Sequence, residues 1–295
     1  MINYSFIIPH KNIPKLLERC VNSIPNRPDI EIIVIDDNSD DIQPLQSMDC
    51  LKKENVHLIC ISKEESKGAG YARNKGMNIA KGKWLVFADA DDFFLSDALN
   101  NKMNNYADSL ADIVFFNVEC LFANSFVPVP NADIAYRKFI EAQNATTLCR
   151  YKLKVPWGKF VKRSLIESNT IQFDETKVAN DLIFSLKTGI AATIVEVDKT
   201  SIYTWLVREG SLTSIKSKET AYIHFNASVR YNEILKQNSL EDYRKYRNNL
   251  FFSLPNLYRN SYSYIEIFKM IFINTPTKYL ITDFFKAIIA YTKKK

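Results

Sequence analysis

The segment Glu31-Ile32-Ile33-Val34-Ile35-Asp36-Asp37-Asn38-Ser39 joins a continuous apolar run to an abrupt polar end. A short apolar run that is bounded by turn-forming residues is typical of a buried strand. The segment Lys83–Ala88 repeats this pattern, because it also ends in acid, at Asp89-Ala90-Asp91-Asp92. Two such segments indicate a sheet whose strands end in carboxylates.

Apolar runs and helical patterns alternate around these two strands, and this alternation is the signature of an α/β fold. Further strands are predicted over Tyr4–Ile8, Val56–Ile61, Asp112–Val118, Thr193–Val197 and Ser201–Leu206. Helices are predicted over Pro14–Ile24, Ala69–Gly82, Ile134–Cys149 and Asn180–Ala191, and from Ser96, a candidate N-cap. From residue 216 onward the pattern is helical, and the last helix is expected to begin at Thr275-Pro276.

The acidic strand ends predict a ligand site, since ligands of open α/β sheets bind beyond the carboxyl ends of the strands. Asp36 and Asp37 would meet Asp89, Asp91 and Asp92 there, and five carboxylates repel one another unless a cation neutralises them. The D-x-D spacing lets two carboxylates share Mg²⁺ or Mn²⁺ and leaves positions open for a diphosphate. The alternative, that such clusters only form turns, explains one cluster more readily than two.

The segment Lys67–Gly76 joins a glycine-containing turn to a helix start, which is a favourable place for anionic groups. Arg73 lies in the first turns and could reach a nucleotide or a phosphate. The alternative is a surface arginine on an amphipathic helix.

Four ordered motifs resemble the nucleotide-sugar-binding half of the family 2 glycosyltransferases, which have the GT-A fold. The motifs are Ser5-Phe6-Ile7-Ile8-Pro9-His10-Lys11-Asn12, Val34-Ile35-Asp36-Asp37-Asn38-Ser39, Gly70-Tyr71-Ala72-Arg73-Asn74-Lys75-Gly76 and Phe87-Ala88-Asp89-Ala90-Asp91-Asp92. Pro156–Phe160 and Asn180–Phe184 resemble acceptor-side segments of the family, and Ile202-Tyr203 with Arg208–Thr213 resembles its closing loop. The resemblance covers about residues 3–215. It implies a Rossmann-like sheet with helices on both faces, followed by a C-terminal helical extension.

The resemblance implies two regions. Residues 1–215 would form the catalytic domain, with a nucleotide-sugar half over about 1–118 and an acceptor half over about 119–215. Residues 216–295 would form a separate basic, aromatic-rich helical region.

The resemblance also implies an inverting, metal-dependent transfer of a hexosyl or N-acetylhexosaminyl group. The donor would be a nucleoside diphosphate-sugar, expected to be a UDP-sugar. The acceptor would be a hydroxyl of a growing, lipid-linked surface glycan of the capsule or lipopolysaccharide type. The general base would be Asp181, since inversion needs one base on the acceptor face, opposite the leaving diphosphate.

By the same resemblance, Asp37 would bind the base of the nucleotide with help from Arg73. Asp89 and Asp91 would bracket the ribose and the metal-bound diphosphate. The predicted donor-binding residues are Pro9, Lys11, Asp36, Asp37, Gly70, Arg73, Asp89, Ala90 and Asp91. The predicted ligands of Mn²⁺ or Mg²⁺ are Asp89, Asp91 and Asp92. The candidate acceptor-binding residues are Trp157, Lys159, Asn180, Trp205 and Arg208.

Two positions depart from the family pattern. Lys11 stands where the family usually has an aromatic residue that stacks on the base. Asn180 stands where an acidic residue commonly precedes the general base, so we expect the pKa of Asp181 to be raised less. Two alternatives remain open here: Asp181 could only cap a helix, and Trp157 and Trp205 could be core aromatics rather than sugar platforms.

The composition divides the chain unevenly. The 295 residues carry a net charge of +6, yet residues 1–215 hold 25 basic and 27 acidic side chains. Residues 216–295 hold 14 basic and 6 acidic side chains and 16 of the 37 aromatic residues. This concentration predicts a peripheral contact with an anionic membrane surface; the alternative is that the apolar stripe packs on the catalytic domain. A uniformly basic nucleic-acid binder would have a different charge pattern.

The remaining composition predicts a reduced, cytoplasmic protein, and the family resemblance implies that it acts at the inner face of the cytoplasmic membrane. The five cysteines are odd in number and lack zinc-site spacing. We expect no signal peptide at the beginning of the chain and no transmembrane helix.

Two other functions are weaker. A nucleotidyltransferase acting on sugar phosphates would need a glycine-rich loop after the first strand, where Pro9-His10-Lys11-Asn12 has no glycine. A non-catalytic nucleotide-sugar-binding protein would not need the complete D-x-D.

Overall fold

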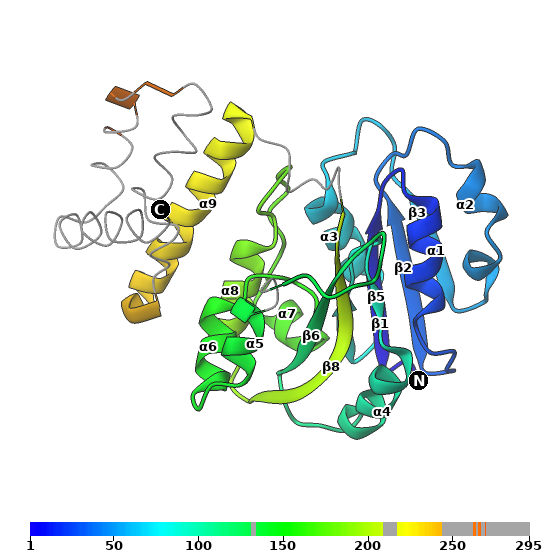
Figure 1. Cartoon of the computed structure of the whole chain (residues 1–295), viewed down its shortest axis with the longest axis horizontal. Coiled ribbons are helices and arrows are strands. Elements are labelled where there is room, and N and C mark those ends of the chain that lie inside the picture. Colours follow the sequence, from blue (N-terminus) through cyan, green and yellow to red (C-terminus); the bar gives the residue numbers. More distant parts are fainter. Residues whose placement is uncertain (131–133, 209–216, 244–261, 264, 267–268, 270–295) are drawn as a thin grey trace. The chain divides into compact units, whose positions relative to one another are not determined.

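The computed structural model describes residues 1–130, 134–208, 217–243, 262–263, 265–266 and 269 (Figure 1). The chain divides into two compact units, Met1–Glu209 and Gly210–Lys295, and each is treated by itself. The expected start of the last helix at Thr275-Pro276 lies outside the described residues.

An eight-stranded mixed sheet forms the centre of the first unit, in the order β3-β2-β1-β4-β7-β6-β8-β5. Four neighbouring strands, β3, β2, β1 and β4, are parallel, whereas β7 is antiparallel to both β4 and β6. β8 pairs in parallel with β6, and β5 is antiparallel to β8 at the edge. The strands are β1 (Tyr4–His10), β2 (Ile30–Asp36), β3 (Val56–Cys60), β4 (Trp84–Phe87), β5 (Phe93–Phe94), β6 (Ile113–Phe122), β7 (Lys159–Lys162) and β8 (Val195–Val207).

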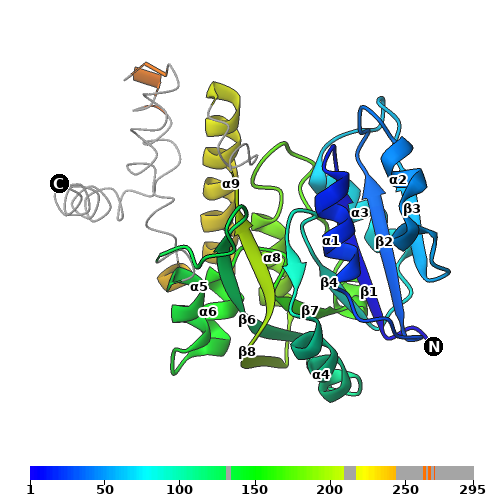
Figure 2. The ribbon, with the colours of Figure 1, turned by 45° about the vertical axis from the view of Figure 1, so that its right-hand side comes forward.

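The sheet is covered on both faces over its parallel half. Every residue of β1, β2 and β4 is buried, although successive side chains of a strand point to opposite faces. The helices of this unit are α1 (Pro14–Asn22), α2 (Gln43–Ser47), η1 (Asp49–Lys52), α3 (Ala69–Ile79), α4 (Ser96–Tyr106), α5 (Ile134–Ile140), α6 (Ala145–Lys152), α7 (Arg163–Ser168) and α8 (Leu182–Ala191). The predicted α/β fold is confirmed, and Figure 2 shows helices packed along the sheet.

Three predicted elements differ from the structure. The helix expected over Ile134–Cys149 is two helices, α5 and α6, and the two strands expected over 193–206 are one strand, β8, whose register against β6 shifts near Asn117. Ser96 is the first helical residue of α4, so the N-cap position falls to Leu95. The short strands β5 and β7 were not expected, because a few residues are too short to show an alternating pattern.

The described part of the second unit is mainly α9 (Lys218–Gln237), followed by η3 (Glu241–Tyr243). Ser217 and Thr220 form a reciprocal capping box at the start of α9, which confirms helix at this point. Within the described residues, the helices are all too short or too polar to cross a bilayer.

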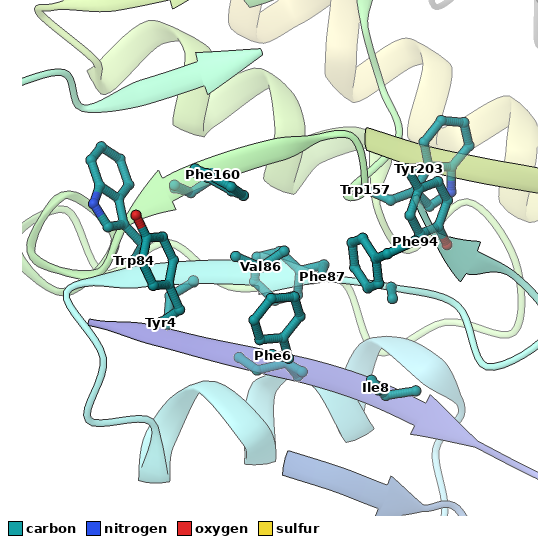
Figure 3. Packing of buried hydrophobic residues seen from close by; sticks show 14 of the residues in the cluster. Tyr4, Phe6, Ile8, Trp84, Val86, Phe87, Phe94, Trp157, Phe160 and Tyr203 are labelled. Atoms are coloured by element: carbon teal, nitrogen blue, oxygen red, sulfur yellow. The ribbon is translucent and has the colours of Figure 1, made fainter. Parts of the chain in front are cut away.

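Aromatic side chains fill the core where the parallel and antiparallel halves of the sheet meet (Figure 3). Phe160 of β7 lies with its ring 5.4 Å from Tyr4 and 4.6 Å from Phe116. The hydroxyl of Tyr4 donates to the Met103 carbonyl, and the indole N–H of Trp84 donates to the Tyr106 carbonyl. The buried polar groups of these rings are therefore satisfied, as a close-packed core requires.

A buried carboxylate connects the amino ends of β1 and β2 to the turn before β4. Glu31 is 3% exposed, and its Oε1 accepts from the Ser5 hydroxyl at 2.6 Å and from the backbone N–H of Lys81 at 2.5 Å. The N–H of Gly82 is shared between this oxygen and the Ser5 oxygen. One side chain of β2 thus satisfies donors from two other segments, β1 and the turn before β4.

We predict that Glu31→Leu lowers the free energy of unfolding by about 2 to 4 kcal/mol, because several buried donors lose their acceptor. Urea unfolding followed by circular dichroism measures this loss. The exposed Glu54→Leu is the matched control and should change stability by less than about 0.5 kcal/mol. Equal effects at the two positions would contradict the role given to Glu31.

Candidate active site

The carboxyl ends of β1 and β2 are joined by a buried hydrogen bond between His10 and Asp36. His10 Nδ1 lies 2.7 Å from Asp36 Oδ1, and His10 Nε2 accepts the backbone N–H of Ile13. Because Nε2 is an acceptor, the ring donates to Asp36 through Nδ1–H. Burial alone would raise the pKa of Asp36, but hydrogen bonds from His10 and Ser39 outweigh it and lower the pKa.

Asp36 therefore has a structural role at the end of β2. Its exposure is 0%, and both of its oxygens accept hydrogen bonds, from His10 and Ser39 on one side and from the Ser39 backbone on the other. The expected contact of Asp36 with the donor stays a prediction.

Asp37 follows Asp36 at the carboxyl edge of the sheet, and one of its two carboxylate oxygens has no donor among the described residues. Its Oδ2 accepts the backbone N–H of Gly68 at 3.1 Å, which ties the end of β2 to the start of α3. Its Oδ1 is buried and has no hydrogen-bond partner among the described residues. A buried oxygen without a donor is costly, so this atom is suited to accept an N–H from a ligand.

The D-x-D turn follows β4, and each of its acids is held by an arginine. Arg73 Nη2 lies 2.5 Å from Asp89 Oδ1, and Arg208 Nε lies 2.7 Å from Asp91 Oδ2. A third arginine, Arg19 of α1, donates to the backbone carbonyl of Asp91 at 2.6 Å. Because β2, β1 and β4 are parallel neighbours, Asp37 and the two D-x-D acids lie at the same edge of the sheet.

Asp92 holds the D-x-D turn in place through buried hydrogen bonds to β8. It is 1% exposed, and its oxygens accept the Tyr203 hydroxyl at 2.7 Å and the Leu206 N–H at 2.8 Å. The Tyr203 hydroxyl in turn accepts the backbone N–H of Asp89. Burial, with the nearby charges of Asp89 and Asp91, raises the pKa of Asp92 well above its ordinary value. The geometry therefore gives Asp92 a structural role, in place of the expected role as a metal ligand.

Gly70 packs against another segment of chain, and its contact with a donor stays a prediction. A Cβ at this position would lie 2.0 Å from the backbone oxygen of Asp174 and 3.0 Å from the Cβ of Asn180. Arg73 is 4% exposed and contacts the same segment, because its Nη1 donates to Asn180 Oδ1 at 2.9 Å. Arg73 thus lies between the D-x-D turn and the residue before Asp181, and its contact with a nucleotide base remains a prediction.

Asp181 occupies the N-cap position of α8, yet its side chain makes no capping hydrogen bond. The alternative that Asp181 only caps a helix is therefore not supported. Burial raises the pKa of Asp181, Asp89 adds to this, and the positive charges of Arg73 and Lys159 partly oppose it. A carboxylate with a raised pKa takes up a proton more readily near neutral pH.

Two lysines lie near Asp181, the buried Lys159 and the half-buried Lys154. Lys159 is 2% exposed, with its ammonium 5.2 Å from the centre of the Phe115 ring. Burial lowers the pKa of Lys159 to about 8 and that of Lys154 to about 7, although the charge of Asp181 favours the protonated form of both. Lys159 is too deeply buried for the expected direct contact with an acceptor, and its charge acts on Asp181 instead.

The two candidate sugar platforms differ. Trp157 is 6% exposed and stacks between Tyr136 and Tyr203, at 5.7 Å and 5.3 Å, so it is a core aromatic and not a platform. Trp205 is half-buried and packs on Trp157 at 6.2 Å. Pro9 and Ala90 are buried, whereas Lys11 is exposed.

Four residues that organise the site were missed by the sequence analysis: His10, Arg19, Asn74 and Tyr203. Each acts through a hydrogen bond to a segment distant in sequence, and no local pattern signals such a contact. His10, Asn74 and Tyr203 do lie inside recognised motifs, which was the only available signal for them.

The residues present fit a hard divalent cation bound with a diphosphate. Among the described residues no group of three or more His, Cys, Asp or Glu is placed to hold a metal ion. Asp89 and Asp91 are partly exposed, at 34% and 23% of their side chains, and each carboxylate uses one oxygen for its arginine. Mg²⁺ needs only one or two carboxylates when phosphate oxygens complete its coordination.

A family model described as glycosyl transferase family 2 matches residues 5–169. The poly(ribitol-phosphate) beta-glucosyltransferase of Bacillus spizizenii is 29% identical over 254 residues, which cover 82% of this chain but only 38% of that protein. The cholesterol galactosyltransferase of Borreliella burgdorferi is 27% identical over 287 residues, which cover 91% of this chain and 75% of that protein.

Among solved structures, TarS of S. aureus in complex with UDP-GlcNAc superposes with a TM-score of 0.66 at 20% identity. The match covers 90% of this chain and 77% of that chain. This likeness confirms the expected GT-A fold. Asp181 and Arg208 lie beyond the residues that the family model matches.

We predict that the stability gained by Lys159→Met depends on pH. The pKa of Lys159 is about 8 when folded, against 10.5 ordinarily, so between these values the unfolded chain binds more protons and the wild type gains stability as pH rises. Lys159→Met removes the cost of burying a charge, so its advantage over the wild type should be largest near pH 7 and shrink by about pH 9.5.

Urea unfolding of both proteins at the two pH values measures this difference. The exposed Lys15→Met is the control, and its effect should not vary over the same range. A pH-independent effect of Lys159→Met would show that Lys159 keeps its ordinary pKa.

Proposed function

The chain belongs to glycosyl transferase family 2, and on that basis we propose that it transfers a hexosyl or N-acetylhexosaminyl group from a nucleoside diphosphate-sugar to a hydroxyl of a surface glycan. Transfer occurs with inversion, and Asp181 is the general base. The relatives are named for glucose and galactose transfer, and their named acceptors, poly(ribitol phosphate) and cholesterol, both carry hydroxyl groups.

The single observation that carries the proposal is the double contact of Arg73. One guanidinium binds the D-x-D residue Asp89 and the residue that precedes Asp181, although these lie far apart in sequence. The donor-side acids and the candidate base therefore belong to one site.

The donor is a uridine diphosphate-sugar. The free Oδ1 of Asp37 offers an acceptor for the N–H of a nucleobase, and the structure neighbour TarS binds UDP-GlcNAc. Lys11 is exposed at the position of the missing aromatic residue and cannot stack on the base as a ring would.

Asp89 and Asp91 would hold Mn²⁺ or Mg²⁺ through the oxygens that their arginines leave free. The cation supplies positive charge to the leaving diphosphate. Arg208 contacts Asp91 and adds positive charge at the same place.

Asp181 takes the proton of the acceptor hydroxyl while the oxygen of that hydroxyl attacks the anomeric carbon of the donor. The new glycosidic C–O bond forms as the bond to the diphosphate breaks, and a single displacement inverts the anomeric centre. The raised pKa of Asp181 favours proton uptake.

The experiment starts with the donor. Nucleoside diphosphates are added with Mn²⁺ in thermal unfolding, and UDP should raise the melting temperature most, because binding to the folded state stabilises it. The UDP-sugars are then assayed for UDP release with a panel of hydroxyl-bearing glycans.

We predict different effects for two acids in this assay. Asp181→Asn should lower turnover by about 10²-fold or more with UDP affinity unchanged, because it removes only the base. Asp91→Asn should lower both turnover and the Mn²⁺-dependent affinity for UDP measured by calorimetry. Asp49→Asn, on the exposed surface, is the control. Normal turnover by Asp181→Asn would refute the base assignment.

The proposal includes a peripheral contact with the inner face of the cytoplasmic membrane and a lipid-linked acceptor. Support comes from residues 216–295, where 14 basic side chains exceed 6 acidic ones and 16 residues are aromatic. Basic segments of this kind bind anionic headgroups through charge and apolar burial.

We predict that replacing Lys293, Lys294 and Lys295 by Glu lowers co-sedimentation with vesicles containing anionic lipid, because repulsion replaces attraction at the surface. Vesicles of neutral lipid are the control and should bind both proteins equally weakly. Unchanged binding to the anionic vesicles would refute the contact of these lysines.

A further inference from the structure

The first turns of α3 grip the segment 173–180, which leads directly to Asp181. Asn74 binds the backbone of Phe173 twice: its Nδ2 donates to the carbonyl at 3.0 Å, and its Oδ1 accepts the N–H at 2.9 Å. Gly70 allows the helix to approach Asp174 and Asn180 more closely than any side chain would permit. The segment is therefore docked on the helix at both of its ends.

Arg73 makes the contact nearest to the chemistry. Its Nη1 donates to Asn180 Oδ1 at 2.9 Å while its Nη2 pairs with Asp89, and its Cζ lies 5.3 Å from the centre of the Phe173 ring. The guanidinium is planar and rigid, so its two bonds hold Asn180 and Asp89 in a fixed relation.

Asn180 is also the centre of the hydrogen bonds within the segment. Its Nδ2 donates to the Thr176 carbonyl at 3.3 Å, and its own carbonyl accepts the N–H of Asp174 at 3.0 Å. The Thr176 hydroxyl donates to the Val178 carbonyl at 2.8 Å. Asn180 thus joins an internally bonded loop to Arg73.

The side chain of Asp181 makes no capping bond to the helix that it precedes. Its backbone carbonyl accepts the N–H of Ser185 at 2.9 Å, so its main chain is tied to α8 on one side and to Asn180 on the other. Charges from Arg73, Asp89, Lys159 and Lys154 act on it from the surrounding elements.

We propose that Asn180 is a positioning residue, which holds Asp181 at a fixed place relative to the D-x-D turn through its hydrogen bond from Arg73. The inference rests on the proposed function, since it takes Asp181 as the base. It assigns the Gly70-Tyr71-Ala72-Arg73-Asn74 segment to the base side of the site as well as to the donor side.

A neutral amide suits this position. The single charge of Arg73 is already opposed by Asp89, and the amide accepts from Arg73 without adding a third negative group beside Asp89 and Asp181. Asn180→Asp keeps an acceptor oxygen for Arg73, whereas Asn180→Leu has similar size and no acceptor.

The test uses the full chain, the UDP-sugar that it turns over, and UDP as the probe of the donor side. Asn180→Leu should lower kcat by about 10- to 100-fold, because a misplacement of about 1 Å at a reacting group has this effect. Its affinity for UDP in calorimetry should stay within about twofold, and Asn180→Asp should restore most of kcat. Asn169→Leu, which removes an amide bound to the Leu165 carbonyl outside the segment, is the control.

Three results would overturn the inference: full kcat in Asn180→Leu, an equal loss in Asn180→Asp, or a fall in UDP affinity that matches the fall in kcat. If the unfolding curve of Asn180→Leu differs from that of the wild type, Asn180→Ala takes its place, because it removes the same hydrogen bonds without added bulk. Asp181→Asn in the same assay separates the two proposals. Activity there refutes the base itself, whereas an inactive Asp181→Asn beside a fully active Asn180→Leu refutes only the positioning role.

Discussion

The crowding of carboxylates at one edge of the sheet is the constraint on which the site depends. Like charges in a partly buried place raise one another's pKa, so each must be compensated or kept neutral. Arg73 compensates Asp89, Arg208 compensates Asp91, and Asp92 is buried with a raised pKa. The compensation is incomplete at Asp89 and Asp91, since each arginine binds one oxygen of its carboxylate, and the proposed function uses the other oxygen of each for a cation.

The mixed half of the sheet supplies hydrogen-bond and ion-pair partners to the acids that follow the parallel strands. β8 pairs in parallel with β6 and so ends at the same edge, where it brings Tyr203 under Asp92 and Arg208 onto Asp91. The aromatic stack of Tyr136, Trp157 and Tyr203 fixes the ring whose hydroxyl bonds Asp92 and Asp89. The packing of the core is therefore coupled to the geometry of the turn.

The acids of the site could be predicted from the sequence because they follow buried strands, and strand direction alone places strand ends at a common edge. What could not be predicted is where each side chain points. Asp36 and Asp37 are neighbours, yet one is sealed beneath His10 and Ser39 and the other keeps a free oxygen. Gly70 belongs to a recognised motif, but a glycine is required there because the backbone of Asp174, which lies far along the chain, approaches too closely for a side chain. The short strand β7 carries too few residues to show a period, so its role between β4 and β6 was invisible.

The pKa of Asp181 depends on burial and on charged residues that are distant in the sequence, which the identity of its neighbour Asn180 does not reveal. Because Asn180 is neutral, the sequence suggests that Asp181 lacks the like charge that would raise its pKa. In the folded chain that charge comes from Asp89, with burial as the larger cause, and Arg73 and Lys159 oppose both. Arg73 is at the same time the residue that fixes Asn180. The neutral side chain at 180 therefore leaves the charge of Arg73 to be balanced between Asp89 and Asp181. This departure from the family pattern keeps Asp181, the proposed base, connected to the D-x-D turn without adding to the repulsion between the carboxylates.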